Sequence, residues 1–297
     1  MSKGIRTALA AAVGVMLVVG TLAGCSGSSG SAGSSGSSGA TGGTPAKTLN
    51  IGMELAYPPF ETKDTGGNPT GVSVDFIKDF GAAYGYDVVI QNTAWDGLIP
   101  SLQTGKVDAV ISSMTITAER AKQVSFSDPY AMSQLALLVN KNSGIKVADD
   151  LNQAGKSVAV KTGSTGDVWA TKNLPNAEVH RLADESACVT EVVQGKSDAF
   201  IYDQLTIYRN QQKNPDTTDA VFIPFQDPEH WGIAVKLGNT ALLDELNAFI
   251  AKSKTDGEFD RLTDKYLSSE YQTFRQFGFP WFFDFSDGPT PSAVPTG

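Results

Sequence analysis

The chain has 297 residues, of which 41% are hydrophobic and 19% are charged. This composition predicts a globular body with a hydrophobic core, arranged as one large domain or two of ordinary size. The formal net charge is −9, and an acidic chain attracts phosphate backbones poorly, so we expect no nucleic-acid partner. Histidine occurs only at His180 and His230, and cysteine only at Cys25 and Cys188. That supply is too small for a Cys/His zinc site or a disulfide framework.

Residues 1–24 have the features of an export signal. Lys3 and Arg6 form a short positive start before an uncharged apolar stretch, which ends in Leu-Ala-Gly-Cys. This ending resembles the bacterial lipobox, which implies that residues 1–24 are removed and that Cys25 is lipid-modified. The alternative is an uncleaved membrane anchor, because the stretch is almost long enough to span a bilayer. Both interpretations place the body outside the cytoplasm, on the outer face of a bacterial membrane. Residues 25–46, rich in Gly and Ser, are predicted to form a flexible tether.

Strand-like and helix-like segments alternate along the body. Residues 48–53 and 88–91 are predicted as strands, and 107–111 form a short β-branched run typical of a buried strand in a parallel sheet. Residues 71–84 carry apolar side chains at helical spacing, and 97–103 form a second short helix. This alternation predicts an α/β protein.

The body also repeats part of its own sequence. Residues 105–111, Gly-Lys-Val-Asp-Ala-Val-Ile, match residues 195–201, Gly-Lys-Ser-Asp-Ala-Phe-Ile. A single duplication predicts two similar α/β lobes rather than a solenoid, although chance similarity of a short string is the alternative. Polar residues follow both copies, and they also follow another predicted strand at 157–160. Because open α/β sheets bind ligands beyond the carboxyl ends of their strands, we expect the site there.

Four motifs carry a resemblance to a known family. They are IGMELAYPPF at 51–60, WDGLIPSL at 95–102, ISSMTITAER at 111–120 and FSDPY at 126–130. The third is the most specific, because a strand end, a helix start and an Arg occur in it at fixed spacing. With these motifs the chain resembles the family-3 extracellular solute-binding proteins, which serve ABC importers of polar amino acids.

The resemblance implies a two-lobed periplasmic-binding-protein fold of type II, with a mixed sheet flanked by helices in each lobe and two hinge crossings. Lobe one is expected to take residues 47–139 and 234–270, and lobe two residues 140–233. Residues 271–285 are crowded with aromatic side chains, which we expect to pack onto the protein's own surface rather than against a permease or membrane. Residues 286–297 are expected to form a disordered tail.

The resemblance further implies a pocket for the carboxylate of an amino acid. Arg120 offers a planar fork of donors that suits a carboxylate, whereas a solvated Arg in the first turn of a helix is the alternative. Thr115 and Thr165 are expected to add hydroxyl and backbone N–H donors to the same carboxylate. Their alternative role is that of ordinary helix caps.

The ligand's ammonium group is expected to be bound at the other end. By resemblance, Asp203 holds it, and Ser112 and Ser113 complete the cage through hydroxyl and carbonyl oxygens. A carboxylate that directly follows an apolar run needs a partner if it is buried. The alternative for Asp203 is an N-cap of the helix after it.

Aromatic walls and one acidic residue are expected to surround the ligand's side chain. Tyr57, Phe60 and Trp95 match aromatic positions of the family, and of the three Phe60 is the foremost candidate for a plain core residue. Glu54 is the candidate for specificity. A carboxylate that faces aromatic rings favours a cationic ligand such as Arg, Lys, ornithine or His, with Gln next.

These observations predict an extracytoplasmic binding protein that delivers a polar L-amino acid to an ABC permease in the membrane. We expect a lipid-anchored monomer with no cofactor, no metal and no catalytic activity. An enzyme on the same scaffold, similar to cyclohexadienyl dehydratase, is one alternative, with Glu54 and Asp203 as its acid/base pair. The other alternative is the binding module of a sensor.

Overall fold

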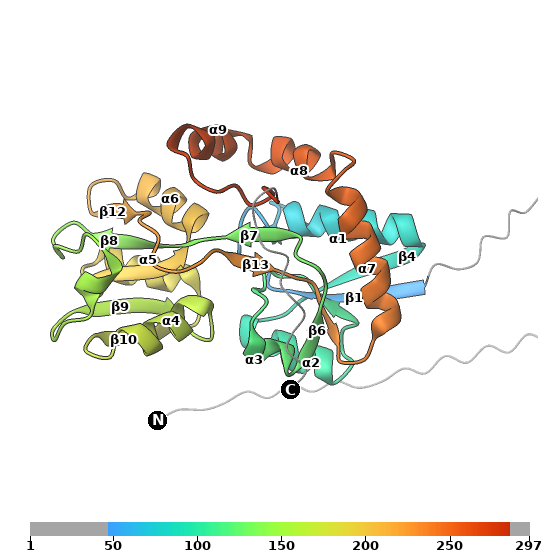
Figure 1. The fold of residues 1–297 in the computed structure, drawn as a ribbon, viewed down its shortest axis with the longest axis horizontal. Helices are drawn as coiled ribbons and strands as arrows, with labels where there is room; N and C mark the ends of the chain where they lie inside the picture. The colour runs from blue at the N-terminus through green and yellow to red at the C-terminus, as the bar shows by residue number, and fades with distance from the viewer. Residues whose placement is uncertain (1–46, 286–297) are drawn as a thin grey trace, which may run out of the picture. The chain divides into compact units, whose positions relative to one another are not determined.

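The computed structural model describes residues 47–285. The predicted export signal, the lipid-modified Cys25, the tether and the tail at 286–297 lie outside the described residues. Figure 1 shows the arrangement of the helices and strands in the described part.

The first lobe is built on a five-stranded mixed sheet. β1 runs parallel to β4 and β5, and β14 runs antiparallel to β5 and β6. The strands, in spatial order, are β4 (Tyr86–Asn92), β1 (Lys47–Met53), β5 (Ala109–Val110), β14 (Ala234–Lys236) and β6 (Val124–Phe126). The three strands predicted in this region are confirmed, although β5 is shorter than the apolar run at 107–111.

The second lobe repeats this plan with a second five-stranded sheet. β9 runs parallel to β10 and β11, and β8 runs antiparallel to β11 and β12. The strands, in spatial order, are β10 (Glu178–Leu182), β9 (Ser157–Lys161), β11 (Ala199–Asp203), β8 (Leu135–Asn140) and β12 (Thr218–Val221). Because alternate side chains of a strand point to opposite faces, Val158 and Ala159 join different hydrophobic clusters on the two faces of this sheet.

Helices cover both faces of each sheet, as expected for an α/β protein. The helices of the first lobe are α1 (Val72–Tyr84), α2 (Leu98–Gln103), α3 (Ala118–Ala121), α7 (Thr240–Ser253) and α8 (Glu258–Tyr266). Those of the second lobe are α4 (Thr165–Asn173), α5 (Glu185–Val193) and α6 (Gln204–Lys213), and α9 (Ser268–Phe277) follows α8. Short elements complete the fold: β2 (Thr62–Lys63), β3 (Pro69–Thr70), and the 3₁₀ turns η1 (Trp95–Gly97) and η2 (Ala148–Leu151). Gly85 ends α1 in a left-handed conformation that glycine adopts without strain.

The sequence repeat has the same structural role in both lobes. Asp108, in the first copy, accepts a hydrogen bond from the backbone N–H of Asn50 on β1 at 2.8 Å. Asp198, in the second copy, accepts one from the backbone N–H of Ser157 on β9 at 2.8 Å. Each aspartate directly precedes the middle strand of its sheet, β5 or β11, and ties it to the parallel strand beside it. The two copies therefore occupy equivalent positions in the two sheets, in agreement with the predicted pair of similar lobes.

Two strands connect the lobes. β7 (Ala131–Ser133) leads from the first sheet to the second, and β13 (Glu229–Trp231) leads back and pairs antiparallel with it (Figure 1). The passage at β7 comes a few residues before the expected lobe boundary at 139, because all of β8 hydrogen-bonds within the second sheet.

The aromatic residues near the C-terminus pack against the protein itself, as expected. Phe274 and Phe282 are fully buried, and Trp281 is 6% exposed. Glu270 on α9 forms an ion pair with Arg209 on α6 at 2.6 Å. Phe274, Trp281 and Phe282 therefore add to the core of the described part.

Candidate functional site

A cavity lies where the two lobes meet, at the carboxyl ends of β1, β5, β9 and β11. Its lining comes from both lobes and from the crossing strands. Nine of the ten side chains expected to bind a ligand line it: Glu54, Tyr57, Trp95, Ser112, Ser113, Thr115, Arg120, Thr165 and Asp203. The structure thus brings together residues that lie up to 149 positions apart in the sequence.

Phe60 is the exception and corrects the expected aromatic wall. Its side chain is fully buried and does not line the cavity. It stacks behind Tyr57 at 5.4 Å between ring centroids and meets Trp231 and Phe282 edge-on, each at 4.9 Å. Phe60 is therefore a core residue that supports Tyr57, and Trp231 supplies an aromatic lining residue that the sequence reasoning missed.

The guanidinium of Arg120 lies at one end of the cavity. It donates to the backbone oxygen of Thr115 at 2.8 Å and to that of Gly163, in the second lobe, at 3.1 Å. It also lies over the Trp95 ring, 5.1 Å from the centroid. Burial lowers the pKa of Arg120, and the charge of Glu229 opposes this effect. The fork is thus held in place by carbonyl oxygens, with further N–H groups left for a carboxylate.

Asp203 also lines the cavity, and the structure shows its alternative role as a helix cap. It is the N-cap of α6, because its Oδ1 accepts from the backbone N–H groups of Leu205 and Thr206 at 2.9 and 3.1 Å. Its Oδ2 is buried, and within residues 47–285 the Tyr57 hydroxyl interacts with this carboxylate without forming a hydrogen bond of full geometry. Burial raises the pKa of Asp203, and the Tyr57 hydroxyl and the donors at the start of α6 oppose this effect. This buried carboxylate is suited to an ammonium group.

The two serines of the predicted cage lie in different environments. The Ser112 hydroxyl accepts from the backbone N–H of Glu54 at 3.0 Å, which joins the ends of β5 and β1. The Ser113 hydroxyl is buried and interacts with the side chains of Glu61 and Tyr130. The backbone of Ser113 has φ 48°, a region that non-glycine residues seldom adopt and that is often found at functional sites.

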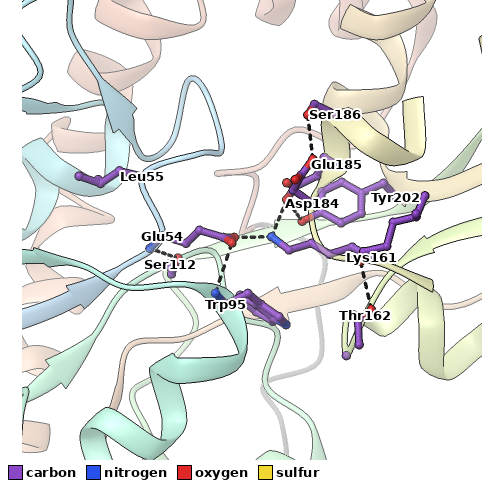
Figure 2. Close-up of polar contacts among 12 residues, drawn as sticks. Glu54, Leu55, Trp95, Ser112, Lys161, Thr162, Asp184, Glu185, Ser186 and Tyr202 are labelled. Carbon is purple, nitrogen blue, oxygen red and sulfur yellow. Dashed lines mark hydrogen bonds and ion pairs between the residues drawn. The ribbon is translucent and has the colours of Figure 1, made fainter. Parts of the chain in front are cut away.

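Lys161 is buried beside the cavity and contacts two of its lining residues, Glu54 and Glu185 (Figure 2). Its ammonium group pairs with Glu54 and with Glu185, the latter at 2.9 Å, and lies 5.2 Å from the centroid of the Trp95 ring. The Tyr202 hydroxyl donates to Glu185 at 2.6 Å. Burial alone would lower the pKa of Lys161, but the two carboxylates outweigh burial and raise it. Lys161 therefore balances the charge of Glu54 through an ion pair. The prediction from the sequence had left this carboxylate free to meet the ligand.

Several residues in or beside the cavity were not predicted from the sequence, although two had a usable signal. Lys161 is the last residue of β9 and Tyr202 precedes Asp203 on β11, so both stand at the strand ends where the site was expected. Glu61, Glu185 and Glu229 had no such signal, because only the three-dimensional fold brings them to the cavity.

Two further properties bear on the class of the protein. Residues 47–285 contain no cluster of three or more His, Cys, Asp or Glu side chains that is arranged to hold a metal ion. Within the same residues, each helix is too short or too polar to cross a lipid bilayer.

The fold and the cavity define a two-lobed binding protein for a small polar molecule. The chain belongs to the family described as "Bacterial extracellular solute-binding proteins, family 3", whose sequence model matches residues 49–269. Its place of action is therefore outside the cytoplasm. It is a solute-binding protein rather than an enzyme, in line with its named relatives, which are amino acid-binding proteins and in some cases are named for ABC transporters.

The relatives differ in the amino acid for which they are named. A probable histidine-binding protein of Neisseria gonorrhoeae is 33% identical over 229 residues, which is 76% of this chain and 85% of the relative. An ancestral arginine-binding protein solved with arginine has a TM-score of 0.69 at 36% identity, over 75% of this chain and 99% of the other. A structure of an ancestral arginine-binding protein bound to glutamine gives a TM-score of 0.67 at 36% identity, over 74% and 97%.

Proposed function

We propose that the chain captures one polar L-amino acid between its lobes and delivers it to an ABC permease in the membrane. The observation that carries this proposal is that one cavity contains both Arg120, with its fork of donors, and the buried carboxylate of Asp203. These groups match the carboxylate and the ammonium that every α-amino acid presents. Lobe closure about β7 and β13 would trap the ligand.

The pair of Glu54 and Lys161 favours a ligand with a neutral amide side chain, glutamine foremost. An amide can donate to the Glu54 carboxylate, and it needs no charge of its own because Lys161 already balances the charge of Glu54. A cationic ligand must instead share the carboxylates with Lys161, and two like charges would be brought together in a poorly solvated site.

A cationic amino acid is the second candidate. Two carboxylates and the Trp95 ring surround the Lys161 ammonium, and this environment suits any ammonium or guanidinium group. A ligand that displaced Lys161 would take over these contacts. The relative solved with arginine is compatible with this possibility.

The attachment to the membrane is also part of the proposal. We propose that Cys25 carries a lipid anchor and that the protein acts as a monomer close to its permease. Mass spectrometry of the membrane fraction tests the anchor. A mature protein that begins at an acylated Cys25 is expected, and an unprocessed N-terminus would contradict it.

Calorimetric titration tests the ligand. The purified protein is unfolded and refolded to remove carried-over ligand and is then titrated with the standard amino acids, ornithine and citrulline. Tight one-to-one binding of glutamine with weaker binding of arginine and lysine is expected. Preference for arginine or lysine would support the second candidate, and no binding across the panel would contradict the proposed function.

A further inference from the structure

One carboxylate of the cavity joins both lobes and a crossing strand. Glu229, the first residue of β13, accepts through Oε2 from the hydroxyl of Thr115 at 2.9 Å and from that of Thr165 at 2.8 Å. Its Oε1 accepts from Gln226 Nε2 at 2.7 Å. Thr115 follows β5 in the first lobe, and Thr165 begins α4 in the second.

The protons of these hydroxyl groups are already used. A threonine hydroxyl has one proton to donate, and an ionised carboxylate can only accept. While both threonines donate to Glu229, neither hydroxyl can donate to the carboxylate of a ligand. The sequence had led us to expect both hydroxyl groups to donate to the ligand carboxylate. In the structure, Arg120 and the backbone N–H groups of Thr115 and Thr165 are left to bind that carboxylate.

The position of these backbones then depends on Glu229. Hydrogen bonds to a charged group are stronger than those between neutral groups, and they fix the distance between the two threonines. β13 is itself held by pairing with β7, with Glu229 opposite Ser133. Glu229 therefore belongs to one of the two crossing strands and is held in place by the other. From this position it fixes one threonine of each lobe, and with it one backbone N–H donor, close to Arg120.

We propose that Glu229 is a positioning residue of the amino-acid site, which holds the Thr115 and Thr165 backbones at the spacing that the ligand carboxylate requires. It does so without touching the ligand. This inference rests on the proposed function for its ligand, but the contact between the lobes exists independently of any ligand.

Two substitutions at one position test the role by ligand binding. Glu229→Ala is expected to weaken amino-acid binding about tenfold or more, mainly through faster release, because both threonine contacts are lost. Glu229→Gln keeps an acceptor oxygen and is expected to stay within about threefold of the parent. The exposed Glu178→Gln controls for the loss of one negative charge. Equal or tighter binding by Glu229→Ala would overturn the proposal, because it would show that Glu229 competes with the ligand carboxylate.

Small-angle X-ray scattering of the ligand-free proteins separates this inference from the proposed function. Glu229→Ala is expected to have a larger radius of gyration than the parent and Glu229→Gln, since one contact between the lobes is lost. Identical radii in all three would overturn the proposal. If the parent binds no amino acid, the proposed function fails, and the scattering comparison still decides whether Glu229 holds the lobes together.

Discussion

At the scale of single residues, Arg120 provides the most direct test of the site. We expect Arg120→Ala to weaken amino-acid binding at least ~100-fold, because a charge-assisted hydrogen bond contributes about 1.5–3 kcal/mol and Arg120 is expected to form more than one. Arg120→Lys is expected to recover little of this, since it keeps the charge but not the planar fork. Calorimetry measures binding, and thermal unfolding verifies that both variants remain folded. Unchanged affinity in a cooperatively folded Arg120→Ala variant would place the carboxylate elsewhere.

The internal cation leads to a prediction about specificity. Lys161→Met leaves Glu54 and Glu185 without their buried counter-charge, and such carboxylates attract another cation. We therefore expect the affinity ratio of arginine or lysine to glutamine to rise at least ~10-fold, the equivalent of about 1.4 kcal/mol. Competition titrations measure the ratio, and the exposed Lys172→Met serves as the matched control. A ratio that does not change would show that Lys161 does not select the ligand's charge.

Glu61 leads to a prediction about pH. Its side chain is 1% exposed, and burial raises its pKa from 4.5 to about 8, although the hydroxyl groups of Ser73 and Ser113 oppose this effect. The folded state therefore binds a proton more tightly than the unfolded state does, so this group lowers the free energy of unfolding as the pH rises from about 4.5 to 8.

Glu61→Gln mimics the protonated carboxyl and removes this dependence. We expect the variant to gain stability relative to the parent as the pH rises, by about 1.4 kcal/mol per pH unit within this range. Urea unfolding at several pH values between 5 and 8 measures the difference. Parallel stability curves for the two proteins would mean that Glu61 is already ionised in the folded state at pH 5.

At the scale of elements, the two repeated aspartates, Asp108 and Asp198, are predicted to contribute similar amounts to the free energy of unfolding. Asp108→Ala and Asp198→Ala each leave a strand N–H without its acceptor, which costs about 1–3 kcal/mol when the group is buried. We expect both to lower the free energy of unfolding by similar amounts, measured by urea unfolding. Asp87→Ala, on the exposed side of β4, is the control and is expected to change little. A loss of stability in only one of the two variants would show that the two copies do not have the same structural role.

The sequence predicts elements well where local pattern and tertiary environment agree. The period of apolar residues identified α1, β1 and β4, and the repeated Gly-Lys-x-Asp-Ala unit identified the two related sheets. The site at the strand ends followed from these elements. The role of Lys161 did not, because the pairing of its ammonium with Glu54 joins residues 107 positions apart in different lobes. Phe60 was included among the ligand-binding residues because the sequence alone does not distinguish an aromatic residue that lines a cavity from one that packs in the core behind it.

At the scale of the whole molecule, the C-terminal segment connects both lobes. Phe279 packs against Phe222, which follows β12 of the second lobe, at 4.7 Å between ring centroids. The backbone N–H of Met132 on β7 donates to the backbone oxygen of Phe282 at 2.8 Å. The Phe283 ring stacks on that of Phe259 of α8, in the first lobe, at 4.8 Å between centroids. A segment that contacts both lobes and a crossing strand contributes to any change in the angle between the lobes.

Phe279→Ala therefore has two expected effects. Loss of the ring contact with Phe222 lowers the free energy of unfolding by about 1–3 kcal/mol, and it accelerates release of the bound amino acid severalfold because the arrangement with both lobes in contact is less stable. Phe285→Ala is the matched control, because this ring lies against Phe259 and the Lys254 ammonium, both in the first lobe. It is expected to reduce stability without changing release. Stopped-flow measurement of dissociation separates the two effects. Equal release rates in both variants would show that the C-terminal segment stabilises the fold but takes no part in holding the lobes together.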